Sequence, residues 1–356
     1  MNGAQRTTMR ITKLKKTSDY TVKFKNHYFA TQNYITLQMK KLLVALFALF
    51  FILFTSAYFL IPNPIQISKI TLINCSKNGI YRYLADQNRW QLWWPKINAQ
   101  NKESVGDQTG LFIYNTSCYR ITKKLLDGIE ISIQQNDLQY KSLLRVFSEG
   151  TDSVITTWDC TMDAGSNPIK RILAYRQAVK IKKNMDAIVE SLRIFAEKKE
   201  NIYTIEISKS SIADTLLIAT KHITSVYPTT KEIYDLLNPL KNYAIKSGAS
   251  QTGSPMLNVT RLSEKEFQSM VAIPINKELP AHGNIFPQKM IPGNFIVTQI
   301  KGGVFAINNA LEQIQNYFDD YHKTSMAIPF QSLVTDRSKE TDTSKWITNI
   351  YAPVMK

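Results

Sequence analysis

One uninterrupted apolar stretch, residues 42–61, constrains this chain more than any other feature of its sequence. It reads LLVALFALFFILFTSAYFLI and contains no charge, Gly or Pro. As a helix, at about 1.5 Å per residue, it reaches roughly 30 Å, the thickness of the hydrocarbon core of a bilayer. Lys40 and Lys41 come directly before it, and Pro62 and Pro64 follow it. We therefore predict a single transmembrane helix over residues 42–61.

The charge before this stretch predicts its orientation. Residues 1–41 hold nine Lys or Arg and a single acid, Asp19. Because cytoplasmic flanks carry the excess of Lys and Arg, we expect a cytoplasmic tail, an inner-membrane anchor and periplasmic domains after residue 61. The basic tail has no helical period and no groove-reading module, so we predict no nucleic-acid partner.

The residues at the start of the apolar stretch have the form of a bacterial signal anchor. Met39-Lys40-Lys41 forms a short positive segment that leads directly into the apolar run. Residues 1–38 are then an over-extended start or a disordered tail, with the true start at Met39. Thr55-Ser56-Ala57 offers small residues at which a peptidase could cut. The run is longer than the usual hydrophobic region of a cleaved signal, so we expect the anchor to be retained.

The remainder of the chain is long enough for two domains. About 295 residues follow the apolar stretch, which exceeds one typical domain. The three cysteines, Cys75, Cys118 and Cys160, show no CxxC spacing, so we predict neither a zinc site nor a disulfide framework. Three buried thiols are the favoured reading, and one bridge between Cys118 and Cys160, expected on neighbouring strands, is the alternative.

Residues 65–198 predict one domain that ends in a long helix. Strand-like alternation covers residues 65–73, and β-like runs separated by hairpin signals lie between residues 110 and 160. Between them, residues 88–95 (NRWQLWWP) hold three Trp in five positions, which concentrates aromatic mass for packing or for a pocket wall. A helical apolar pattern then runs over residues 169–199.

This order resembles the START-like or polyketide-cyclase superfamily. The resemblance is carried by the strand at residues 65–73, the short helix at residues 81–86 and the stretch DQNRWQLWWP at residues 86–95. It implies a helix-grip fold, in which a curved antiparallel sheet wraps a long C-terminal helix. It also implies a cavity for a small or lipidic apolar molecule, with Trp90 and Trp94 as ligand-binding residues. A structural or degenerate cavity is an equal alternative.

Residues 201–356 predict a second α+β domain with an internal repeat. The expected order is strand, strand, helix, strand, strand, repeated once with variations. Helices are expected from residue 228 onward and over residues 306–321. The strands are expected at residues 202–207, 215–221, 255–262, 266–274, 294–301 and 346–354.

This second domain resembles the effector-binding domain of multidrug-sensing and AraC-type regulators, also called the gyrase-inhibitor-like domain. The resemblance implies a groove between two pseudo-repeats that binds flat apolar or cationic molecules, with Phe305 and Tyr351 in its lining. An aromatic groove suits such ligands through apolar contact and cation–π attraction. The motifs that carry the resemblance are GSPM at residues 253–256, MVAIPI at 270–275, GGVF at 302–305 and WITNIYAPV at 346–354.

One motif departs from the family pattern. Drug-sensing members present a buried Glu in a Pro-Phe-Glu-x-Tyr stretch, whereas this chain reads Pro329-Phe330-Gln331-Ser332-Leu333. A carboxylate can compensate the desolvation of a cationic ligand, but a neutral amide can only hydrogen-bond it. We therefore expect Phe330 and Gln331 to face a neutral apolar ligand, or a protein partner on the same surface.

The sequence offers no catalytic constellation. Its four histidines are isolated, and it has no G-x-S-x-G, Walker or G-x-G-x-x-G motif, so we assign no catalytic residue, metal or cofactor. Two hypotheses remain. The chain is either a membrane-anchored module that binds or senses a small apolar or aromatic ligand, or a hydrolase- or cyclase-like enzyme acting on a hydrophobic substrate. The enzyme would use cavity residues such as Asp86 or Tyr114.

Overall fold

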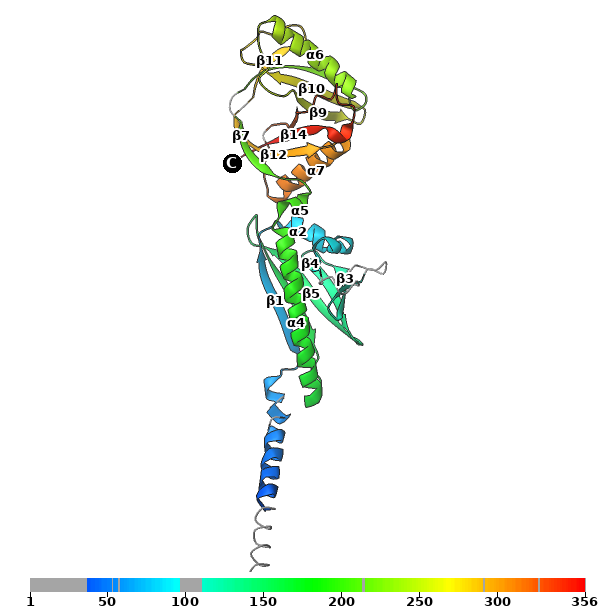
Figure 1. The fold of residues 1–356 in the computed structure, drawn as a ribbon, viewed down its shortest axis with the longest axis vertical. Helices are drawn as coiled ribbons and strands as arrows, with labels where there is room; N and C mark the ends of the chain where they lie inside the picture. Colours follow the sequence, from blue (N-terminus) through cyan, green and yellow to red (C-terminus); the bar gives the residue numbers. More distant parts are fainter. Residues whose placement is uncertain are drawn as a thin grey trace, which may run out of the picture. The chain divides into compact units, whose positions relative to one another are not determined.

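The computed structural model describes residues 37–96 apart from 53 and 57, and residues 111–212, 215–290, 292–325 and 327–355. The predicted basic tail lies outside the described residues up to residue 36. The chain divides into two compact units. The first contains the described residues up to Gln66 and Met162–Lys180, and the second contains Ile67–Thr161 and Ile181–Lys356. The fold class is α+β with two antiparallel sheets, as predicted (Figure 1).

The first unit contains the apolar helix Leu37–Leu60. Among the described residues, it is the one helix long and apolar enough to cross a membrane by length and composition. Its most apolar window has a mean hydropathy of 2.5, and none of that window is buried in the protein. Within the described residues the helix covers Leu37–Leu60, so it extends on the N-terminal side of the predicted start at residue 42. That this helix spans a membrane stays a prediction.

The first sheet has six strands in the order β1-β6-β5-β4-β3-β2, so that consecutive strands from β2 to β6 are neighbours. The pairs from β2/β3 to β5/β6 are antiparallel, as the hairpin signals predict. Each strand begins and ends within a few residues of the predicted bounds. The strands are β1 Ile65–Ile73, β2 Phe112–Tyr114, β3 Ser117–Lys124, β4 Gly128–Gln135, β5 Leu138–Ser148 and β6 Val154–Met162.

Two helices of this half of the chain were predicted, a short one at residues 81–86 and a long one at residues 169–199, and the other three were not. The short ones are α2 Lys77–Leu84, η1 Gln87–Arg89, α3 Trp90–Trp93 and α5 Lys199–Tyr203, and the long one is α4 Pro168–Ala196. In the second unit, α4 buries Ile181, Met185, Ile188 and Leu192. Asn184 lies on the same helix and donates to the Ser117 hydroxyl at 3.3 Å, which ties α4 to the sheet.

The expected position of the cysteines is wrong. Cys118 lies on β3 and Cys160 on β6, and β4 and β5 lie between these strands. All three thiols are free. Burial raises the pKa of Cys160 to about 11 and that of Cys75 to about 12, the latter with a further contribution from Asp320. Both thiols therefore stay protonated and unreactive at neutral pH.

The second sheet has eight strands in the order β11-β8-β10-β9-β13-β14-β12-β7. The predicted repeat is present: the order strand, strand, helix, strand, strand occurs twice along the chain. The prediction of a strand at residues 202–207 is wrong, since α5 ends there, and β7, β11 and β13 were not predicted. The elements are β7 Ser208–Ile212, β8 Thr215–Thr224, α6 Thr230–Lys246, β9 Met256–Ser263, β10 Glu266–Pro274, β11 Phe286–Met290, β12 Gly293–Lys301, α7 Val304–Asp320, β13 Phe330–Leu333, η2 Thr343–Lys345 and β14 Ile347–Val354.

The two repeats exchange their first strands. β7 begins the first repeat along the chain but pairs with β12 of the second repeat. Conversely, β11 begins the second repeat but pairs with β8 of the first. Each repeat therefore supplies an edge strand to the other, and neither can complete its own part of the sheet alone.

The short connection between β11 and β12 forces this sheet to curl. These strands lie six positions apart in the sheet order. In a flat sheet, with strands about 4.8 Å apart, the separation would be roughly 29 Å. Two residues connect Met290 to Gly293, and three steps of about 3.8 Å cover at most about 11 Å. The sheet must therefore bend into an arch whose two ends meet.

The two longer helices cover the outer face of the arch. α6 packs on β8 and β10, and α7 packs on β12 and β14. α6 begins with a capping box, in which Thr229 and Glu232 hydrogen-bond each other's backbone N–H groups. Its apolar side packs on one face of the strands through Ile218, Val271 and Ile273. Because side chains alternate along a strand, Leu217 and Ala272 point to the opposite, inner face.

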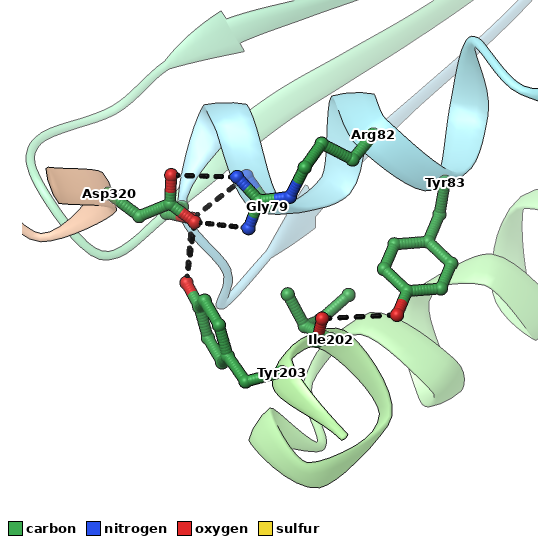
Figure 2. A network of polar contacts seen from close by, with 7 residues as sticks. Gly79, Arg82, Tyr83, Ile202, Tyr203 and Asp320 are labelled. Carbon is green, nitrogen blue, oxygen red and sulfur yellow. Dashed lines mark hydrogen bonds and ion pairs between the residues drawn. The ribbon is translucent and has the colours of Figure 1, made fainter. Parts of the chain in front are cut away.

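An ion pair joins α2 to the end of α7 within the second unit. Figure 2 shows the Asp320 carboxylate between Arg82 and Tyr203. The two guanidinium nitrogens of Arg82 donate to the two carboxylate oxygens at 3.0 and 2.6 Å, and the Tyr203 hydroxyl donates at 2.8 Å. Burial raises the pKa of Tyr203, and the nearby Asp320 adds to this rise. Burial alone would lower the pKa of Arg82, but Asp320 more than offsets it, and the net shift is upward.

Gly79 lets α5 pack closely against α2 beside this ion pair. A Cβ at position 79 would lie 2.6 Å from the Ser76 hydroxyl and 3.1 Å from a methyl group of Ile202. The next contact of α2 is made by Tyr83, whose hydroxyl donates to the Ile202 carbonyl at 3.0 Å. A side chain at position 79 would therefore separate the two helices that hold the ion pair.

The ion pair predicts an asymmetric loss of stability. The Asp320 side chain is 2 % exposed and that of Arg82 is 32 % exposed. Arg82→Met leaves a buried carboxylate without its cation and should lower the free energy of unfolding by about 3 kcal/mol. Asp320→Asn keeps an acceptor and leaves a guanidinium that water can reach, so we expect a loss of about 1–2 kcal/mol. Urea denaturation of the full chain in detergent measures both.

Arg193→Met is the matched control for these variants. Arg193 pairs with Glu190 on the same helix and with Glu197 directly after the end of that helix, and all three side chains are partly exposed. An exposed pair of this kind contributes less than about 1 kcal/mol. Equal losses for Arg82→Met and Arg193→Met would contradict a structural role for the buried pair.

Candidate functional site

A cavity of about 470 Å³ lies on the inner face of the arch. Its volume falls within the range of small-molecule sites, roughly 300–1,000 Å³. Strands from both repeats line it, including β11 and β12 at the two ends that the short connection brings together. The lining residues are Leu217, Met256, Leu257, Asn258, Met270, Ala272, Gln288, Lys289, Met290, Pro292, Gly293, Asn294, Phe295, Ala327, Ile328, Phe330, Pro353, Val354 and Met355.

The wall of this cavity is predominantly apolar and deformable. Met256, Met270, Met290 and Met355 all line it. Their unbranched thioether side chains have three rotatable bonds and adapt to irregular partners. Lys289 is the one formally charged side chain among the lining residues, and the lining contains no acid.

Three aromatic rings pack together at one side of the cavity, and two of them line it. Phe330 lies opposite Tyr351 in the antiparallel pair β13/β14, and their rings stack with centroids 5.0 Å apart and planes at 7°. Phe295 meets both rings edge-on, at 6.1 Å from Phe330 and 6.2 Å from Tyr351. Phe295 and Phe330 line the cavity, whereas Tyr351 packs behind them. The structure thus brings the predicted residues Phe330 and Tyr351 together.

Gln331 lies elsewhere than predicted. It follows Phe330 on β13, is not among the lining residues, and is buried beside Arg337. A guanidinium nitrogen of Arg337 donates to its amide oxygen at 3.5 Å and to the Thr348 hydroxyl at 2.7 Å. Because successive side chains of a strand alternate between faces, Phe330 in the cavity places Gln331 on the other face.

Arg337 is a buried cation for which the structure shows no carboxylate partner among the described residues. It is 5 % exposed, and its guanidinium lies 4.7 Å from the centre of the Trp346 ring. Its Nε has no hydrogen-bond partner. Desolvation lowers the pKa of Arg337, while Tyr234 and Tyr227 act in the opposite direction. A positive charge therefore lies beside Gln331, on the face of β13 that is turned away from the cavity.

The structure does not bring the remaining predicted site residues to the cavity. Phe305 lies in the first turn of α7 and is 88 % exposed. Trp90 and Trp94 are buried in the other half of the chain, stacked with centroids 5.2 Å apart. Their indole N–H groups donate to the backbone carbonyls of Leu84 and Ile113. Such satisfied and mutually packed rings form a core, so their aromatic mass serves packing.

Among the described residues, no contact places Asp86 or Tyr114 in a nucleophile–base pair. Asp86 caps η1 by accepting from the Asn88 N–H at 3.1 Å, and it pairs with Arg89 at 3.3 Å. Tyr114 lies on β2 beside the hairpin turn at Asn115. Within the residues that the structure describes, no group of three or more His, Cys, Asp or Glu side chains could hold a metal ion.

The sequence did not predict the methionines of the cavity wall or the contribution of β11 to it. Met256 and Met270 stand inside motifs that carry the family resemblance, and Met270 alternates with buried Val271 and Ile273 on β10. That alternation gives a signal for a second face. The wall from Gln288 to Met290 has no such signal, because β11 is short and contains Pro287.

Comparison with known proteins yields matches to solved structures only. No family model and no curated protein matches the chain. The cryo-EM structure of an EcmrR–DNA complex matches 53% of this chain and 70% of its own, at 20% identity and a TM-score of 0.39. The crystal structure of the EcmrR C-terminal domain matches 43% of this chain and 98% of its own, at 18% identity and a TM-score of 0.38.

A third match is to SAV2435 in a structure with bound tetraphenylphosphonium. It covers 42% of this chain and 94% of SAV2435, at 16% identity and a TM-score of 0.29. The gyrase-inhibitor-like resemblance of residues 201–356 stays a prediction. The polyketide-cyclase-like resemblance of residues 65–198 stays a prediction.

The contact between Arg337 and Gln331 predicts the effect of an acid at position 331. Gln331→Glu places a carboxylate beside a buried guanidinium, and a charge-assisted hydrogen bond replaces a weak neutral one. We expect the free energy of unfolding to rise by about 1 kcal/mol at pH 7, measured by urea denaturation. In an Arg337→Met background the same substitution buries an unpaired carboxylate and should be destabilising. Equal effects in both backgrounds would show that residues 331 and 337 do not interact.

Proposed function

We propose that this chain is a membrane-anchored protein that binds a neutral, apolar small molecule in the cavity of the arch. The observation that carries this proposal is the composition of the cavity wall: four methionines, two stacked or edge-on aromatic rings and no acid. An apolar wall of this kind binds a ligand by removing the ligand's apolar surface from water. Its flexible methionines can adapt to ligands of different shapes. Asn258 and Asn294 offer polar groups that can orient the ligand.

The charges around the cavity favour a neutral ligand over a cationic one. SAV2435 was solved with the cation tetraphenylphosphonium. In this chain the wall contributes Lys289, and the buried side of β13 contributes Arg337. A cation would lose its hydration without gaining a carboxylate, and both nearby charges would repel it.

The apolar helix supports a location of the proposed site at a membrane. Leu37–Leu60 is long enough to span a bilayer, and the basic residues before it favour a cytoplasmic N-terminus. The sheets would then lie in the periplasm, next to the inner membrane. An apolar ligand partitions into that membrane, so a tether there shortens the path from ligand to site.

Ligand charge and the aromatic wall can be tested together. Native mass spectrometry of the full chain, released from detergent, should show one adduct with neutral N-phenyl-1-naphthylamine. We expect at least about tenfold weaker binding of tetraphenylphosphonium, which corresponds to a difference of about 1.4 kcal/mol. Phe330→Ala removes one face of the stacked pair and should weaken the neutral adduct by about tenfold.

Phe305→Ala is the matched control, because it removes the same side chain from an exposed site outside the cavity. It should leave the adduct unchanged. Absence of an adduct with the neutral probe would refute the proposed function. Equal loss in both variants would place the binding outside the cavity.

The orientation of the anchor is tested separately. Alkaline phosphatase, which is active only in the periplasm, should be active when fused after Lys356. Placing charges in the apolar helix with Leu46→Lys and Phe50→Lys should release the protein from the membrane fraction, since each costs about 3 kcal/mol at a helix centre. Activity only from a cytoplasmic reporter at the same position would contradict the proposed topology.

A further inference from the structure

The first turns of α4, residues 168–180, expose a row of apolar side chains. Five of them are between 38% and 56% exposed: Ile169, Ile172, Leu173, Tyr175 and Val179. Ile169, Ile172 and Leu173 lie on one side of the helix, since residues three and four apart are neighbours. Ala178, on the other side, is buried. An exposed apolar row of this kind indicates a surface that contacts another molecule or a membrane.

The same turns are strongly basic. Residues 168–180 contain Lys170, Arg171, Arg176 and Lys180 and no acid. Arg176 and Lys180 continue the apolar side of the helix, because they follow Ile172 and Leu173 at helical spacing. Apolar and basic side chains on one helical surface are the combination that binds to anionic lipid surfaces.

Contacts within the first unit fix these turns at the end of the apolar helix. Arg171 donates to the backbone carbonyls of Ile61 at 3.0 Å and Tyr58 at 3.2 Å, and its guanidinium lies 4.6 Å from the centre of the Tyr58 ring. The Tyr58 hydroxyl donates to the Ser166 carbonyl. The start of α4 therefore lies level with the residues at which a membrane-spanning helix would leave the bilayer.

We propose that residues 168–180 form a second membrane contact, an interfacial foot that rests on anionic lipid beside the anchor. Ile169, Ile172 and Leu173 would enter the headgroup boundary, and Lys170 and Arg176 would bind lipid phosphates. This inference rests on the proposed membrane anchoring. The foot fixes the orientation of α4 at the membrane, which a single flexible tether would leave undetermined.

Fluorescence quenching in lipid nanodiscs tests the foot. The full chain carries Cys118→Ser, because Cys75 and Cys160 are buried while Cys118 is partly exposed. An environment-sensitive fluorophore is attached at Leu173→Cys, and the discs contain phosphatidylglycerol, phosphatidylcholine and a lipid with a nitroxide near its headgroup. We expect quenching of about twofold or more in these discs, and less in discs of phosphatidylcholine alone.

Two further labels separate the foot from the anchor. A fluorophore at Phe59→Cys, on the exposed apolar helix, reports insertion of the anchor itself. A fluorophore at Ile245→Cys, exposed on α6, reports non-specific lipid contact. Quenching at Phe59 but not at Leu173 overturns the foot and leaves the anchor intact. Absence of quenching at both positions overturns the membrane anchoring and the foot together.

A double variant tests how much the basic side chains contribute to the contact with anionic lipid. Lys170→Glu combined with Arg176→Glu reverses two exposed charges and leaves Arg171, which holds the turn, in place. This variant should lose the dependence of Leu173 quenching on anionic lipid, with about a twofold drop in phosphatidylglycerol discs. Unchanged quenching would overturn the role of anionic lipid. A foot that instead binds a protein would leave the Leu173 label unquenched in discs that contain lipid alone.

Discussion

The covalent link of two residues between β11 and β12 is the constraint on which the candidate site depends. It joins strands that lie six positions apart in the sheet, so the sheet cannot be flat. Bending turns one face inward, and the side chains on that face meet across a narrow space. Leu217 and Ala272 are too small to fill it, and flexible methionines border what remains. The cavity is therefore a consequence of connectivity, and the exchanged strands β7 and β11 hold both ends of the arch in place.

The ion pair at Asp320 supports the same wall from outside. Asp320 is the last residue of α7, where the partial negative charge of a helix end makes a carboxylate unfavourable without a cation. Arg82 supplies that cation from α2, and Tyr203 supplies a donor from α5. α7 in turn packs on β12 and β14, the strands that carry Phe295, Pro353 and Val354. The buried carboxylate thus fixes the helix that backs half of the cavity.

Local sequence patterns predict most of the helices and strands correctly but fail for a few short segments. The long alternating strands β5 and β10 and the amphipathic helices α6 and α7 follow their patterns closely, because each buries one face of regular spacing. Residues 202–207 alternate like a strand, but Ile202 and Tyr203 are buried in a short helix by contacts with α2. β11 and β13 are too short to show a period, and only their partners in the sheet make them strands.

The candidate site was less predictable than the fold, because it depends on which face of each strand turns inward. The resemblance predicted both Phe330 and Gln331 as ligand-binding residues, but successive side chains of β13 point to opposite faces, so Phe330 lines the cavity and Gln331 does not. A shift of register by one residue would reverse these positions, and no local signal distinguishes the two. The sequence does not reveal the partner of Gln331 either: Arg337 lies in a turn after β13 and is buried against Trp346 by tertiary packing. The positive charge beside β13 therefore comes from Arg337, a residue outside the stretch 329–333 on which the prediction rested.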